Sequence, residues 1–186
     1  MSNVILYPIL IPLLFAATLM FFPKRVPLQR IVTLIALLLT IATSIFICWR
    51  VKNEGILTVT LGNWDAPFGI SMVADLFSAL LVLTTSIIAL FVVLFSFPSI
   101  GIEREKHYYY SGVLFLITGI NGSFTTGDLF NLFVFFEVLL MASYLLISIG
   151  GEKIQIRESF KYIIVNIISS SFFVVGVAYL YSVTGT

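Results

Sequence analysis

The sequence predicts an all-α, polytopic membrane protein with six transmembrane helices, and three observations lead to this fold class. Of the 186 residues, 60% are hydrophobic and only 10% are charged. The mean hydropathy is +1.11, so a soluble domain would have too few polar side chains to cover its surface. Six apolar runs follow one another along the chain, at residues 4–22, 31–49, 76–97, 108–126, 129–149 and 162–183.

The first two runs lead into a polar segment. The run at 4–22 has no positive segment before it and no small-residue cleavage site after it, so we expect a retained helix and not a cleaved signal peptide. The run at 31–49 carries no charge. Residues 50–70 are more polar, and ILTVTLG within them alternates apolar residues with Thr, as a strand does. We therefore expect an extracytoplasmic flap at 50–70, with a turn at NWDAPFG.

The later runs have distinct boundaries and interruptions. Asp75 precedes the run at 76–97, and Asp128 precedes the run at 129–149. Both positions are typical of helix N-caps, with a role in ion access as the alternative reading. The run at 108–126 is interrupted by Gly112, Gly119, Asn121 and Gly122. Glycines are common in membrane helices because they allow a neighbouring helix to approach closely.

The placement of Lys and Arg predicts the orientation in the membrane. Three links carry eight of the ten positive residues, namely Lys24, Arg25, Arg30, Arg104, Lys106, Lys153, Arg157 and Lys161. Because Lys and Arg gather in cytoplasmic loops, the links 23–30, 98–107 and 150–161 are predicted to be cytoplasmic. The N-terminus and residue 186 are then predicted to lie outside.

Glu137 is the main candidate functional residue, because it is the one carboxylate near the middle of an apolar run. A charge at that depth costs about 3 kcal/mol or more, so such residues usually face a partner or a hydrated path. Glu137 is therefore predicted to take up and release protons during transport. The alternative is that it stays neutral and only bonds a neighbouring helix. None of the six runs contains a deep basic residue, so this sequence offers Glu137 no obvious cation.

Several hydroxyl and amide side chains form a candidate polar path beside Glu137. Asn166, Ser169 and Ser170 have the i, i+3, i+4 spacing of one helix face, and Ser143 lies on the same run as Glu137. Such a stripe could order water next to a carboxylate. The alternative for the stripe is that it forms hydrogen bonds with a neighbouring helix. The alternative for Ser143 is that its hydroxyl bonds a carbonyl of its own helix.

Other classes of function have little support in the sequence. The single cysteine, Cys48, excludes an internal disulfide, and the single histidine, His107, lies in a charged link. No metal-ligand cluster, phosphate-binding glycine loop or catalytic triad is recognisable, so we expect no cofactor, no bound metal and no enzymatic activity. The net charge of +1 gives no indication of nucleic-acid binding.

Three stretches carry a resemblance to a known family. DLFNLFVFFEVLLMASYLLI, at 128–147, resembles the fifth helix of the antiporter-like subunits that Mrp-type cation/proton antiporters share with respiratory complex I, and Glu137 matches the family's glutamate. ILYPILIPLL and LGNWDAPFGISMVADLFSALLVLTTSI resemble the D-type subunits of Mrp-type (Mnh, Sha) Na+/H+ antiporters more closely than the complex I subunits.

The resemblance implies a longer protein. The family fold has about fourteen helices and contains two inverted repeats, each with a broken helix. This chain would stop part-way through the first repeat, before the helix that carries the family's lysine partner for the glutamate. We therefore expect an incomplete antiporter-like fold, the N-terminal part of a longer subunit, which cannot transport ions alone.

The resemblance also implies function and partners. The leading hypothesis is an ion-translocating subunit of a multi-subunit Na+/H+ antiporter in the plasma membrane, with Na+, H+, the lipid bilayer and other subunits as partners. A second hypothesis is a proton-pumping subunit of complex I or of a membrane-bound hydrogenase. A third is a structural membrane subunit in which the glutamate has no transport role.

Overall fold

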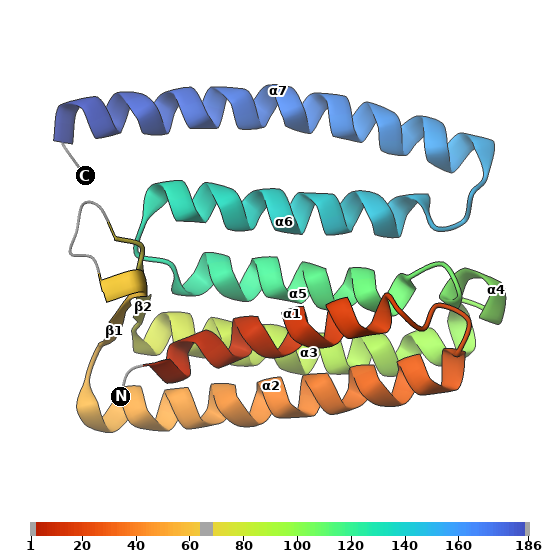
Figure 1. Cartoon of the computed structure of the whole chain (residues 1–186), viewed down its shortest axis with the longest axis horizontal. Coiled ribbons are helices and arrows are strands. Elements are labelled where there is room, and N and C mark those ends of the chain that lie inside the picture. Colours follow the sequence, from red (N-terminus) through yellow and green to blue (C-terminus); the bar gives the residue numbers. More distant parts are fainter. Residues whose placement is uncertain (1–2, 64–68, 185–186) are drawn as a thin grey trace.

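The computed structural model describes residues 3–63 and 69–184. They form a bundle of roughly parallel helices that continues on one side as a single layer, here called the helix row, with a small hairpin at one end (Figure 1). The elements are η1 (Asn3–Leu6), α1 (Tyr7–Leu19), α2 (Val26–Glu54), β1 (Leu57–Thr60), η2 (Leu61–Asn63), β2 (Ser71–Ala74), α3 (Leu76–Ser99), α4 (Ile102–Glu105), α5 (Tyr109–Thr125), α6 (Leu129–Ser148) and α7 (Lys153–Thr184). The predicted turn at 63–69 falls mainly on residues outside the described ranges.

The fold is mostly helical and has the character of a polytopic membrane protein. Four of the described helices, α2, α3, α6 and α7, are long and apolar enough to cross a membrane. Their outer faces expose large apolar side chains, for example Phe77, Phe91 and Phe95 on α3. The helices α1 and α5 are shorter, with 13 and 17 residues, and pack against each other between these spans. A total of six spans therefore stays a prediction.

Helix α5 is central to the packing. It contacts α1, α3 and α6, whereas α7 packs against α6 at one edge of the row (Figure 1). The main apolar core joins α1, α2, α3 and α5 around Leu37, Val93, Leu114 and Ile117. Consecutive helices are neighbours, as short links require, but the pairing of α1 with α5 skips two long helices.

One hydrogen bond accounts for part of the α1–α5 pairing. Pro12 lies inside α1 and has no backbone N–H, so it cannot bond the carbonyl of Pro8 four residues earlier. The buried Asn121 of α5 supplies that donor instead, with its Nδ2 atom 2.9 Å from the Pro8 oxygen. A side chain of α5 thus satisfies the carbonyl that proline leaves unpaired in α1.

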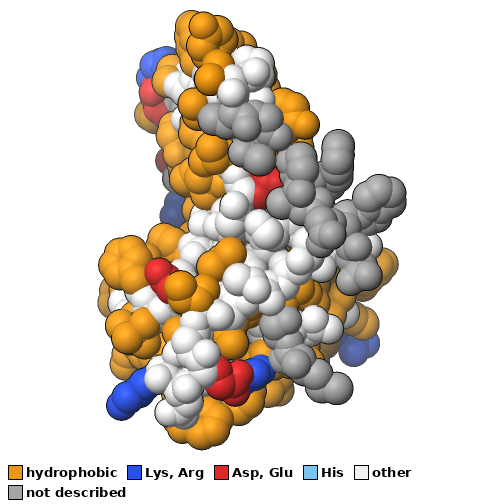
Figure 2. Space-filling view, turned by 90° about the vertical axis from the view of Figure 1, so that its left-hand side faces the viewer, with side chains coloured by type: hydrophobic (Ala, Val, Ile, Leu, Met, Phe, Trp, Pro, Cys, Tyr) orange, Lys and Arg blue, Asp and Glu red, His pale blue; other side chains and the backbone are white. Residues whose placement is uncertain are grey.

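The β1–β2 hairpin packs onto the end of the helix row at which α1 begins. Leu57 pairs with Ala74 and Val59 with Met72, and these four side chains are buried against Ile5, Ile9, Ile47 and Val51. Strand β1 lies within the ILTVTLG stretch that alternation predicted to be extended. Figure 2 views this end and shows hydrophobic side chains mainly along the flanks of the molecule.

Two helices are longer than the apolar runs that predicted them. Helix α2 extends to Glu54, because the i, i+4 ion pair of Arg50 and Glu54 supports a last polar turn. Helix α7 begins at Lys153 instead of 162, since its charged first turns are good helix formers, and Lys161 pairs with Glu158. The predicted polar segments 50–70 and 150–161 are therefore partly helical. The link at 98–107 also contains a helix, the short α4.

Candidate functional site

The candidate site is built on α6, whose start is fixed by the N-cap residue Asp128. One oxygen of the Asp128 carboxyl accepts hydrogen bonds from the backbone N–H groups of Phe130, at 2.7 Å, and Asn131, at 3.1 Å. Asp75 caps α3 in the same way and forms a reciprocal capping box with Ser78. The N-cap reading of both aspartates is confirmed.

One face of α6 lies directly against α5. A Cβ atom added to Gly119 would lie 2.7 Å from the backbone nitrogen of Leu139, and one added to Gly122 would overlap the Phe135 ring. Only glycine fits at these two positions without a shift of one helix. Phe135 and Leu139 flank Glu137 in the sequence, so this close contact holds the backbone of the site in place.

The opposite face of α6, which carries Glu137, lies against α7. Phe133 stacks on Phe173 with ring centres 6.0 Å apart, and Tyr144 meets Tyr162 edge to face at 5.3 Å. Positions 133, 137, 140 and 144 fall on one face of a helix. Glu137 therefore faces the part of α7 between Tyr162 and Phe173.

Two polar atoms at this interface are buried without a partner among the described residues. They are Oε1 of Glu137 and Nδ2 of Asn166. A buried polar atom without a hydrogen bond is costly, so such atoms are uncommon in folded proteins and call for an explanation. Here a carboxyl acceptor on α6 and an amide donor on α7 lie on the same interface, and both are left available.

The predicted polar path is only partly at the interface. Asn166 and Ser170 are half-buried on α7, whereas Ser169 is exposed. The Ser169 and Ser170 hydroxyls donate to the carbonyls of Val165 and Asn166 in their own helix and not to a neighbouring helix. Ser143 is half-buried, but six residues turn a helix by about 240°, so it points to a different side of α6 from Glu137.

Sequence reasoning did not single out Tyr144. Its hydroxyl has the Asn166 side chain, the Glu137 carboxyl and the Tyr162 hydroxyl among its electrostatic neighbours. Its position seven residues after Glu137, two helical turns along one face, was the signal available in the sequence. The Tyr162 ring of α7 packs edge to face on the Tyr144 ring.

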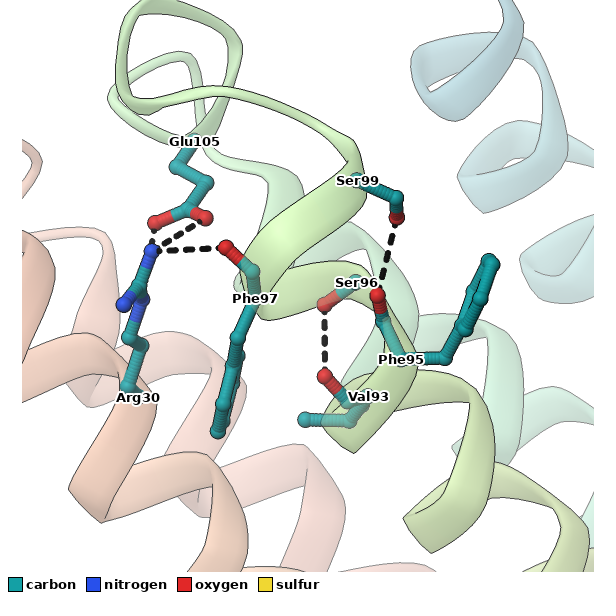
Figure 3. Close-up of polar contacts among 7 residues, drawn as sticks. All are labelled: Arg30, Val93, Phe95, Ser96, Phe97, Ser99 and Glu105. Atoms are coloured by element: carbon teal, nitrogen blue, oxygen red, sulfur yellow. Dashed lines mark hydrogen bonds and ion pairs between the residues drawn. The ribbon is translucent and has the colours of Figure 1, made fainter.

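Sequence reasoning also missed an ion pair at the end of the row opposite the hairpin. Arg30 of α2 donates to both carboxyl oxygens of Glu105 in α4, at 2.7 and 3.0 Å, and to the Phe97 carbonyl at 3.2 Å (Figure 3). Both residues lie in links that the sequence predicts to be cytoplasmic, at 23–30 and 98–107. Among the described residues none forms an ion pair with Glu137.

Comparisons with known proteins agree with this arrangement. Residues 126–186 match the family described as NADH:quinone oxidoreductase/Mrp antiporter, TM. Over all 186 residues the chain is 55% identical to the D subunit of the Na(+)/H(+) antiporter of Bacillus subtilis and 50% identical to that of Alkalihalophilus pseudofirmus. Over its whole length the chain is therefore similar to the N-terminal part of antiporter-like subunits. It spans 38% of the length of these two antiporter-like relatives and matches their N-terminal part.

Solved structures of antiporter-like chains have the same fold. The whole chain superposes on part of a chain of the Mrp complex from Dietzia sp. with a TM-score of 0.90 and 32% identity, covering 35% of that chain. It also matches a chain of the membrane-bound sulfane sulfur reductase, an archaeal respiratory membrane complex, with a TM-score of 0.86, 31% identity and 38% coverage. The predicted resemblance to the antiporter-like family is confirmed.

Proposed function

We propose that the chain is the N-terminal part of an ion-translocating subunit in a multi-subunit Na+/H+ antiporter, and that Glu137 is its protonatable group. The observation that carries the proposal is the buried, unpartnered Oε1 of Glu137 on the face of α6 that meets α7. The two bacterial relatives are named as D subunits of Na(+)/H(+) antiporters, which supports the assignment to sodium–proton exchange.

The physical basis of the proposal is the free-energy cost of a negative charge on Glu137, which depends on what surrounds the carboxyl. A carboxylate in apolar surroundings is costly without a cation or water, whereas the neutral acid is not. Glu137 would therefore bind a proton when no cation is near and release it when a cation or a hydrated path becomes available. No described residue supplies that cation, so the proposal places it in another segment or subunit of the complete assembly.

The experiment compares Glu137→Gln, Glu137→Asp and the control Glu158→Gln in the complete antiporter assembly. Na+-driven proton exchange in inverted vesicles should be abolished by Glu137→Gln and reduced less by Glu137→Asp, which keeps the carboxyl but shortens its reach. Glu158 is exposed on the first turns of α7, so its variant should be fully active. Normal exchange by Glu137→Gln at normal expression would refute the role and favour a purely structural subunit.

A second candidate function follows from the likeness to a respiratory complex. In this reading, the same glutamate would serve a proton pump that is driven by redox chemistry, and the match to the sulfane sulfur reductase supports it. Affinity purification of the native complex distinguishes the two. Flavin or iron–sulfur subunits in the purified complex would favour the redox-driven pump, and their absence with retained Na+/H+ exchange would favour the antiporter.

We further propose that α1 and α5 also cross the membrane, giving six spans. The three basic links lie at one end of the row, and the hairpin, η1 and the end of α7 lie at the other (Figure 1). The positive-inside preference supports a cytoplasmic location for the basic end.

A further inference from the structure

The interface of α6 and α7 contains a cavity between Glu137 and the link that joins the two helices. It is open on one side and has a volume of about 260 Å³. It is lined by Tyr144, Ser148, Ser159 and the apolar side chains of Leu145, Ile156, Phe160 and Ile163. Since a water molecule occupies about 30 Å³ in the liquid, this volume has room for several waters. The Ser148 and Ser159 hydroxyls donate to the Leu145 and Tyr144 carbonyls and keep lone pairs that can accept hydrogen bonds from water.

Tyr144 lies between this cavity and Glu137. It forms part of the cavity lining, and its hydroxyl has the Glu137 carboxyl and the Asn166 amide among its neighbours. Side chains on a helix lean toward its N-terminus, and Glu137 is about 10 Å nearer the N-terminus of α6 along the axis. The phenol therefore extends from the cavity in the direction of the carboxyl.

The surroundings hold the Tyr144 ring, and the Asn166 side chain lies within reach of its hydroxyl. The ring is held by its edge-to-face contact with Tyr162, and the backbone carbonyl accepts a bond from Ser159 at 3.4 Å. A tyrosine hydroxyl can donate and accept a hydrogen bond at the same time. The unpartnered Oε1 of Glu137 and Nδ2 of Asn166 are an acceptor and a donor on the two facing helices.

We infer that the α6–α7 interface is an access path for protons, in which Tyr144 relays a proton from water in the cavity to Glu137 and Asn166 positions the tyrosine hydroxyl. A hydronium ion in the cavity donates a proton to the Tyr144 oxygen as the phenol's own proton passes to the Glu137 carboxylate. The products are water, a neutral tyrosine and a neutral glutamic acid, so atoms and charge balance. This inference rests on the proposed role of Glu137.

The test is Tyr144→Phe in the complete assembly, with Tyr179→Phe as the control because Tyr179 is exposed near the far end of α7. Tyr144→Phe should lower the maximal rate of Na+/H+ exchange about tenfold or more, as expected for loss of a proton-transfer group. The Na+ concentration for half-maximal rate should not change. The ratio of rates in H2O and D2O should increase, because proton delivery becomes limiting. A purely structural role would not change this ratio.

Other variants keep the result interpretable. If Glu137→Gln retains exchange, the proposed function is wrong. If Glu137→Gln is inactive but Tyr144→Phe has the wild-type rate and the wild-type isotope ratio, only the access path is wrong. Should Tyr144→Phe fail to assemble, Ser148→Leu decides the question by filling the cavity while Tyr144 stays in place. Slowed exchange with an increased isotope ratio in Ser148→Leu supports the path, and unchanged exchange overturns it.

Discussion

Arg30 and Glu105, 75 residues apart in the sequence, form a two-armed ion pair in which the carboxylate is completely buried and the arginine is 31% exposed. The guanidinium also lies 5.0 Å from the centre of the Phe97 ring and bonds the Phe97 carbonyl in the last turns of α3. A cation is favourable at a helix C-terminus. This one pair therefore joins α2, the end of α3 and α4.

Loss of Arg30 should destabilise this end of the helix row. Arg30→Met removes the cation and leaves the buried Glu105 carboxylate unpaired, which costs about 3 kcal/mol when a buried pair is broken. Arg30→Lys keeps the charge but cannot make the two-armed contact, so its effect should be intermediate. Thermal unfolding of the detergent-solubilised complex measures both. Equal stability of Arg30→Met and wild type would show that the pair contributes little.

The Asn121–Pro8 hydrogen bond should contribute to stability mainly because residue 12 is proline. Asn121→Leu leaves the Pro8 carbonyl without its 2.9 Å donor, at a cost of about 1–3 kcal/mol. Pro12→Ala restores a backbone N–H that can bond the same carbonyl within α1. Asn121→Leu should therefore cost less in the Pro12→Ala background than in the wild type. A double-mutant cycle on thermal stability measures this coupling, and strictly additive effects would contradict it.

The sequence predicted the local features of this fold but not its long-range contacts. Apolar runs locate the main helices, alternation locates β1, and Asp75 and Asp128 are N-caps, because each signal depends on neighbouring residues. The α1–α5 pairing and the Arg30–Glu105 pair depend on residues 113 and 75 positions apart. Hydropathy also cannot distinguish a helix face covered by lipid from one covered by protein. The position of Tyr144 beside Glu137 could therefore be recognised only from the packing of α6 on α7.

The glycines of α5 should not tolerate a methyl group. Gly119→Ala places a Cβ 2.7 Å from the Leu139 backbone, which cannot move without displacing α6, so a loss of about 1–3 kcal/mol is expected. Gly122→Ala meets the Phe135 ring and should also destabilise. Gly176→Ala on α7 has nothing within 4 Å and is the matched control. Assembly yield and thermal stability are the readouts. A control as damaged as Gly119→Ala would argue against close helix approach as the cause.

Cysteine labelling should place the hairpin and α4 on opposite sides of the membrane, because only α3 separates them in the chain. In a Cys48→Ala background, Thr58→Cys lies on the exposed side of β1 and Glu103→Cys on the exposed side of α4. A membrane-impermeant maleimide should label position 58 in intact cells and position 103 only after permeabilisation, since basic links are retained in the cytoplasm. The reverse pattern would invert the orientation, and labelling of both positions from outside would contradict a membrane crossing by α3.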